Sequence, residues 1–189
     1  KLLREIDIII PENSYISFDW DEISRYRVLT LEFIREFKEE LNWYCISKFQ
    51  KLSEEIIREF ENYVLWRTIS LNQIISESFI REFQHKVSWI RISQKQNLSE
   101  EFIREFQHKL DWDYLSELYE FTDEFLIEFS EKLNWEIYFC YQAASFRMIK
   151  KFICKTEYKE LGNFKISHLN KVEKQELEKI LKLRYLFIK

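Results

Sequence analysis

The chain has 189 residues, of which 46% are hydrophobic and 33% are charged, and its net charge is −4 at pH 7. This composition is that of a folded chain and excludes a disordered one. A single Gly and a single Pro disfavour β-hairpins, and three widely spaced cysteines do not form a disulfide framework. No apolar run reaches the roughly 20 residues of a membrane span, so we expect a cytoplasmic protein with reduced thiols and no membrane partner.

Residues 1–17 follow the pattern of the rest of the chain only loosely. Ile8 and Ile10 fall in register with apolar positions further along, but Pro11 opposes a continuous helix. We interpret this segment as a degenerate N-terminal half-repeat or as a junction. Because the sequence opens at Lys1 and not at a Met, a preceding domain that carries an activity stays open as an alternative.

From residue 18 onward, a repeat with a constant period of 23 residues organises the chain. All six tryptophans follow this period: Trp20, Trp43, Trp66, Trp89, Trp112 and Trp135. Similarity at a fixed short period is the signature of a repeat protein.

Each repeat divides into two predicted helices. The first begins at the Trp, and the residue before it is a good N-cap in five repeats: Asp19, Asn42, Ser88, Asp111 and Asn134. The second begins after a Ser or Thr in all six repeats: Thr30, Ser53, Ser76, Ser99, Thr122 and Ser145. A stripe of helical period follows, as in Phe102, Ile103, Phe106 and Leu110. We expect helices of about seven and about eleven residues, joined by short turns.

The predicted fold is all-α, an α-solenoid of about six two-helix repeats over residues 18–155. A period of 23 residues also suits a leucine-rich repeat, but the apolar stripe has helical and not strand periodicity. A single repeat cannot bury its Phe and Trp side chains, whereas stacked repeats can. After residue 155 the pattern decays, and Gly162 and a basic helix from Leu169 predict a C-terminal capping region over residues 156–189.

The repeat unit L-S-E-E-F-I-R-E-F-x-x-K-L/V-x-W-x-x-I-S occurs at residues 52–70, 75–93 and 98–116. It resembles the short Trp/Phe-rich repeats in proteins of giant DNA viruses of amoebae, of the Mimivirus and Megavirus kind. The resemblance covers about residues 18–155 and weakens in the outer repeats. It implies a repeat protein from an AT-rich viral genome and no enzymatic activity.

Positions that every repeat keeps are predicted to be structural. The predicted repeat core comprises the six tryptophans together with Phe37, Phe60, Phe83, Phe106 and Phe129. A row of serines resembles a string of nucleophiles, but it has no accompanying base and fits close helix contact better: Ser24, Ser47, Ser70, Ser93 and Ser116. Arg35, Arg58, Arg81 and Arg104 are each followed by Glu, and we expect charge ladders between adjacent repeats.

The sequence predicts no catalytic, cofactor-binding or metal site, and no small-molecule substrate. One row contains metal-ligand residue types: Glu39, Asn62, His85, His108, Glu131 and Cys154. Stacked repeats place equivalent residues about 10 Å apart, too far for convergence on one zinc ion. No Gly-rich phosphate loop, H-E-x-x-H or C-x-x-C motif is present.

Positions that change between repeats form the candidate partner-binding face. They lie one, two and five residues after the Trp and include Asp21, Tyr44, Arg67, Ile90, Asp113, Arg91, Tyr114 and Gln94. Mixed aromatic, charged and aliphatic side chains on a regular scaffold are typical of a recognition surface. The favoured hypothesis is therefore a non-catalytic scaffold that binds a protein partner, with a host protein as the expected partner.

The alternative partner is a nucleic acid, bound through the basic C-terminal region. Residues 150–189 contain 11 Lys and Arg and 5 Glu, a net charge of +6, which leaves −10 for residues 1–149. Because phosphate binding needs a basic surface, the charge of the array disfavours this alternative.

Overall fold

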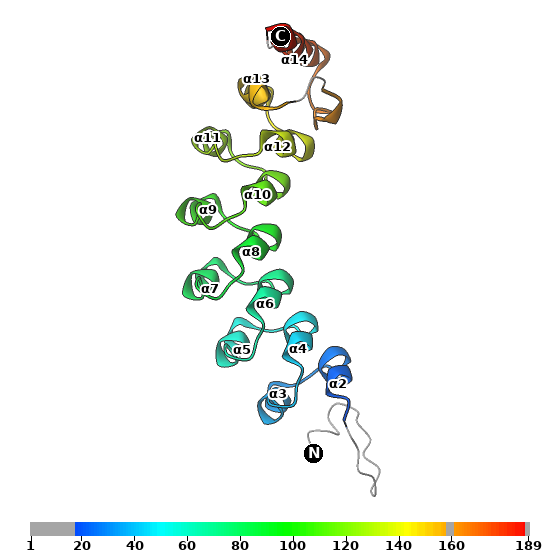
Figure 1. The fold of residues 1–189 in the computed structure, drawn as a ribbon, viewed down its shortest axis with the longest axis vertical. Coiled ribbons are helices and arrows are strands. Elements are labelled where there is room, and N and C mark those ends of the chain that lie inside the picture. Colours follow the sequence, from blue (N-terminus) through cyan, green and yellow to red (C-terminus); the bar gives the residue numbers. More distant parts are fainter. Residues whose placement is uncertain (1–17, 158–160, 188–189) are drawn as a thin grey trace, which may run out of the picture. The chain divides into compact units, whose positions relative to one another are not determined.

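A computed structural model describes residues 18–157 and 161–187, so the half-repeat predicted for residues 1–17 lies outside the described residues. The described chain alternates between two kinds of short helix (Figure 1). The first helices begin at the tryptophans: α2 (Trp20–Tyr26), α4 (Trp43–Phe49), α6 (Trp66–Asn72), α8 (Trp89–Lys95), α10 (Trp112–Leu118) and α12 (Trp135–Tyr141).

The second helices follow the first after short connections. They are α3 (Leu31–Glu36), α5 (Glu54–Glu59), α7 (Glu77–Glu82), α9 (Glu100–Glu105), α11 (Asp123–Glu128) and α13 (Phe146–Phe152). Two short 3₁₀ helices, η1 (Ile153–Lys155) and η2 (Leu161–Asn163), lead to the long helix α14 (Lys171–Phe187). The chain is therefore a helical repeat protein with Trp-initiated helix pairs that pack in sequence, as predicted.

The predicted N-caps are confirmed with one exception. The side chains of all six Ser or Thr residues before the second helices accept a hydrogen bond from a backbone N–H of the first turn. Asp19, Asn42, Asp111 and Asn134 do the same for the first helices. The prediction for Ser88 is wrong, because its side chain makes no capping hydrogen bond.

The second helices are shorter than predicted. In the first five repeats they have six residues and end at a Glu, and the chain turns at the Phe that follows as the C-cap. At Phe60, the carbonyl oxygen accepts from the N–H groups of both Tyr63 and Val64, at 2.9 and 3.0 Å. The apolar stripe continues through this turn because its residues remain four apart, and the sequence pattern therefore does not mark the end of the helix.

From Trp43 onward, each Trp connects the turn before it to the helix that it begins. The indole Nε1 of Trp66 donates to the carbonyl oxygen of Glu61 at 3.0 Å, and the corresponding bond occurs at Trp43, Trp89, Trp112 and Trp135. Trp135 is 3% exposed, whereas the other five tryptophans are partly exposed. The Trp row therefore lines the edge of the core, with one face on Phe side chains and the indole N–H bonded to the backbone.

Both kinds of helix supply fully buried side chains to the core, and the first helices contribute Ile46, Ile69, Ile92 and Leu115. In the second helices, Phe33, Phe79, Phe102 and Phe125 are fully buried, and the Phe row that follows these helices is buried at Phe60, Phe83, Phe106 and Phe129 and partly exposed at Phe37. Each of these residues contacts neighbours one turn or one helix away, such as the Phe79 and Phe83 rings at 4.7 Å between centroids. This pattern repeats with the period of the sequence.

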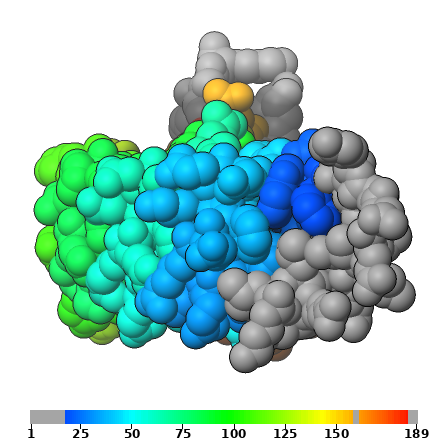
Figure 2. Space-filling model, turned by 90° about the horizontal axis from the view of Figure 1, so that it is seen from below, coloured from blue at the N-terminus to red at the C-terminus, as the bar shows by residue number. Residues whose placement is uncertain are grey.

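The chain divides into two compact units, residues 1–97 and residues 98–189. In unit 1, successive first helices pack directly on each other, from α2 to α4, α6 and α8. Figure 2 shows the repeats of this unit in close contact in chain order, from blue through cyan to green. In unit 2, α10 packs on α12 in the same way. Within the described residues, no pair of second helices makes comparably close contact.

Unit 2 ends in a separate arrangement. Leu177 and Leu181 of α14 are 0% and 3% exposed and belong to one hydrophobic cluster with Phe139, Met148 and Ile149. Helix α14 thus covers apolar side chains of the last repeat. Within the described residues, no helix is long and apolar enough to cross a membrane.

Candidate functional site

The row of buried serines sets the spacing of the first helices. Ser70 is fully buried, its hydroxyl donates to the Trp66 carbonyl at 2.7 Å, and it accepts from the backbone N–H of Ser88 at 3.0 Å. Ser116 makes the equivalent pair with Trp112 and Asn134. The serines therefore join successive repeats by hydrogen bonds, which the sequence interpretation of close contact did not include.

A row of glutamines joins the loops that follow the first helices. Gln73 is 7% exposed; its amide accepts from the Leu52 N–H at 3.1 Å and donates to the carbonyls of Ser47 at 3.0 Å and Gln50 at 2.9 Å. Gln96 makes the same three kinds of bond one repeat later. The sequence carried a signal for this row, since Gln recurs at the period of the Trp in four of the six repeats.

The predicted charge ladders between repeats are confirmed at the described pairs. Arg35 forms two hydrogen bonds to Glu59 of the next repeat, at 2.6 and 2.8 Å. Arg58 pairs with Glu82 at 2.8 Å, and Arg104 with Glu128 at 2.9 Å. Hydrogen bonding to Arg35 holds the pKa of the Glu59 carboxyl below its ordinary value. Because these ion pairs engage charged residues of the second helices with one another, we consider the first helices as the candidate face.

The predicted face residues all lie on first helices. In unit 1, Asp21, Tyr44, Arg67 and Ile90 are exposed on α2, α4, α6 and α8, and Arg91 and Gln94 are partly exposed on α8. In unit 2, Asp113 is exposed and Tyr114 is partly exposed on α10.

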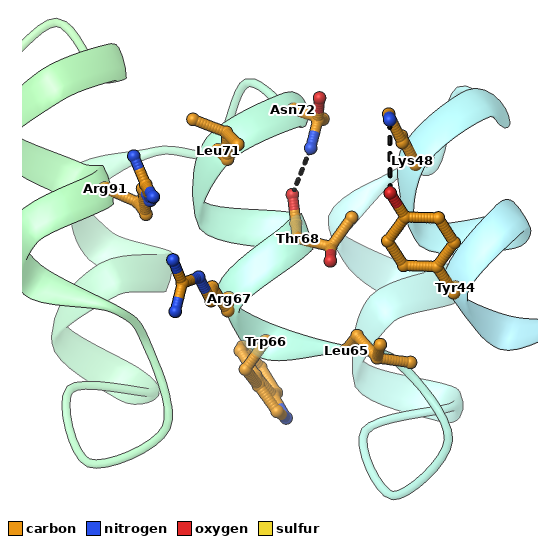
Figure 3. A pocket seen from close by; sticks show the side chains of 9 residues that line it. All are labelled: Tyr44, Lys48, Leu65, Trp66, Arg67, Thr68, Leu71, Asn72 and Arg91. Atoms are coloured by element: carbon orange, nitrogen blue, oxygen red, sulfur yellow. Dashed lines mark hydrogen bonds between the residues drawn. The ribbon is translucent and has the colours of Figure 1, made fainter.

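A groove of about 530 Å³ in unit 1 brings three of the predicted residues together (Figure 3). It is lined by Tyr44, Lys48, Leu65, Trp66, Arg67, Thr68, Leu71, Asn72 and Arg91. The side chains come from α4, α6 and α8, so three consecutive repeats build the groove. Six of these residues occupy the positions one, two and five after a Trp, which are the variable positions of the repeat.

The groove is basic and partly aromatic. Lys48 Nζ donates to the Tyr44 hydroxyl at 3.1 Å, while Arg91 donates to the side chain of Gln94 at 2.7 Å. Arg91 Nε is buried and has no hydrogen-bond partner among the described groups. Because no carboxylate lines this groove, its lysine and two arginines leave a local positive charge on a chain that is acidic overall.

Leu65 lines the groove but is not among the predicted face residues. It occupies the N-cap position of α6, where the other repeats carry a polar residue, and it is 40% exposed. Local violation of a structural rule without compensation often marks a functional surface, and this was the available signal.

A second groove, of about 310 Å³, lies in unit 2. It is lined by Ser130, Glu131, Leu133, Asn134, Trp135, Glu136, Lys155 and Glu157. Glu136 accepts from the Glu157 N–H at 2.6 Å, and Lys155 pairs with Glu131. With three carboxylates and one lysine, this groove has a negative charge.

The residues with metal-ligand side chains lie apart from one another. Glu39 accepts from the Tyr63 hydroxyl at 2.6 Å, which raises the Tyr63 pKa, and Glu131 is occupied by Lys155. Within residues 18–157 and 161–187, no group of three or more His, Cys, Asp or Glu residues is placed to hold a metal ion.

The basic residues near the C-terminus are partly engaged within unit 2. Lys150 pairs with Glu176 of α14, Lys155 with Glu131, and Lys165 donates to the Tyr141 carbonyl at 2.9 Å. The two ion pairs, of Lys150 and Lys155, place a carboxylate beside each of these cations and so reduce the local positive charge.

In comparisons with known proteins, no family model, curated protein or solved structure matches this chain.

Proposed function

We propose that this protein is a non-catalytic repeat scaffold that binds a protein partner along its first helices. The observation that carries the proposal is the distribution of exposed apolar side chains. Large hydrophobic residues that are exposed on first helices are Tyr26, Tyr44, Phe49, Ile90, Leu118 and Tyr141, whereas the described second helices expose only Ile127 in this way. Exposed apolar and aromatic residues concentrated on one set of helices favour a protein-binding surface.

The groove of unit 1 supports the same function. It combines a Tyr, a Trp and two Arg side chains, which are the residue types enriched in the energetically dominant part of protein interfaces. The ladders of Ser and Gln hold the groove residues on a regular backbone, so that binding requires little ordering.

The test is capture of a partner by the immobilised full chain, with bound proteins and RNA both identified. The resemblance of the repeat to those of amoeba viruses makes an amoebal lysate the first source of partners. The face variant is Tyr44→Ala, Arg67→Ala and Ile90→Ala. The matched control is Lys51→Ala, Ile127→Ala and Arg147→Ala, which removes exposed side chains away from the first helices.

We expect a protein that the intact chain and the control variant retain and that the face variant loses. If every retained protein is held equally by the face variant, the proposal is wrong. Retention of RNA alone, abolished by raising the salt concentration, would favour the nucleic-acid alternative instead.

A further inference from the structure

Three first helices of unit 1 carry charges opposite in sign to those of the first helices of unit 2, whereas α2 of unit 1 carries two carboxylates and one arginine. Helices α4, α6 and α8 contain four cations and no carboxylate: Lys48, Arg67, Arg91 and Lys95. Helices α10 and α12 contain three carboxylates and no Lys, Arg or His: Asp113, Glu117 and Glu136. All of these side chains are at least partly exposed. We call these two sets of residues the basic face and the acidic face.

The two faces are built on the same geometry. Arg67 and Asp113 both lie one residue after a Trp, and Lys48 and Glu117 both lie five residues after one. Successive first helices pack directly on each other in both units, joined by the same serine hydrogen bonds. Each face therefore carries charges at the positions one and five residues after a Trp, with opposite signs.

Both faces also expose apolar side chains. Tyr44 and Ile90 on the basic face are 47% and 48% exposed. Leu118 and Tyr141 end the two helices of the acidic face and are 50% and 54% exposed. Charge complementarity sets partner choice and register, while buried apolar groups supply much of the affinity, and these faces offer both.

We propose that the basic face of one molecule binds the acidic face of a second copy of this chain. The inference rests on the proposed function, because it uses the same first-helix surface and names its occupant. A second copy is favoured over an acidic segment of another protein because the chain itself carries a carboxylate surface, at repeat positions equivalent to those of two basic-face cations. The contact is heterologous, because two different surfaces meet: the basic face of one molecule and the acidic face of the other.

The experiment is sedimentation velocity of the full chain over a range of concentrations, at about 0.05 M and about 0.5 M NaCl. We expect the mass to rise above the 23.6 kDa of one chain with concentration at low salt. At high salt the dissociation constant should increase by about tenfold or more. A constant mass of one chain under all conditions would overturn the inference.

Charge-reversal variants distinguish this contact from non-specific association. The variants Arg67→Glu with Arg91→Glu, and Asp113→Lys with Glu117→Lys, should each weaken self-association by about tenfold or more. Equimolar mixing of the two variants should restore association, because the unaltered acidic face of the first variant then meets the unaltered basic face of the second. Restoration also shows that both variants are folded.

Two control variants carry the same charge changes elsewhere. Lys51→Glu with Arg147→Glu, and Glu101→Lys with Glu124→Lys, alter exposed residues outside both faces and should self-associate like the unmodified chain. Equal self-association in face and control variants would overturn the inference. A monomeric chain that still captures a protein through its face would overturn the inference and leave the proposed function intact. If the chain stays monomeric and the face variant loses no captured protein, both the inference and the proposed function are wrong.

Discussion

Unit 1 and unit 2 share one repeat geometry and differ in what they attach to it. Both have first helices of seven residues, a buried Ser that joins successive repeats and a fully buried Phe in the second helix. In unit 2, Tyr119 replaces the glutamine of the ladder, and its ring stacks on Phe121, which in turn stacks on Phe125. The comparison teaches that the core rows are kept while the connecting and exposed rows are free to change.

The largest expected effect tests whether the core is equivalent in the two units. Phe79→Ala in unit 1 and Phe125→Ala in unit 2 each remove a ring that is 0% exposed. We expect each to lower the free energy of unfolding by about 3–5 kcal/mol, through lost burial and the cavity that remains. Urea denaturation measures this loss. A loss confined to one variant would break the equivalence of the units.

The next effect tests where the units differ. Gln73→Ala leaves one N–H and two carbonyl groups without their partner, and we expect a loss of about 1–3 kcal/mol. Gln142→Ala in unit 2 removes the donor to the Glu117 carbonyl and should cost less. The same urea titration compares the two variants. Equal losses would show that the number of hydrogen bonds made by the ladder does not determine its contribution.

A smaller effect tests the serine row, which the units share. Ser70→Ala and Ser116→Ala each deprive one buried backbone N–H of its acceptor. We expect equal losses of about 1 kcal/mol in the two units. Thermal unfolding of both variants, with Ser→Gly changes at the same positions as a second series, provides the measurement. A clear difference between the two stability losses would contradict the same structural role for the serine in both units.

The smallest effect concerns the charge ladder. The Glu59 pKa is lowered by its hydrogen bonds from Arg35, so its contribution to stability is present above the ordinary carboxyl pKa of 4.5. It is lost as the pH falls through the lowered pKa of the folded state. Glu59→Gln should therefore reduce the unfolding midpoint at neutral pH and leave it unchanged at about pH 2. Equal reductions at both pH values would show that the charge of Glu59 is not responsible.

Much of the fold was predictable because its signals are local. The period of the tryptophans, the Ser or Thr before every second helix and the length of the first helices all follow from short-range spacing. The length of the second helices was not, because the turn at each Phe retains the four-residue spacing of a helix. The exposure of the named variable residues on the first helices agrees with the sequence pattern, whereas the groove was not predictable, because it needs side chains from three repeats.

The sequence by itself determined the period, the helix starts and the charges of each first helix, since these depend on residues within one repeat. The tertiary structure decided which hydrogen-bond partners the recurring Gln and Ser side chains have. Gln73 bonds to residues 21 to 26 positions earlier, and Ser47 accepts from Leu65, 18 positions later. It also decided that Tyr44, Arg67 and Arg91 line one groove. Such contacts form only when repeats stack, because no side chain within a single repeat can reach them.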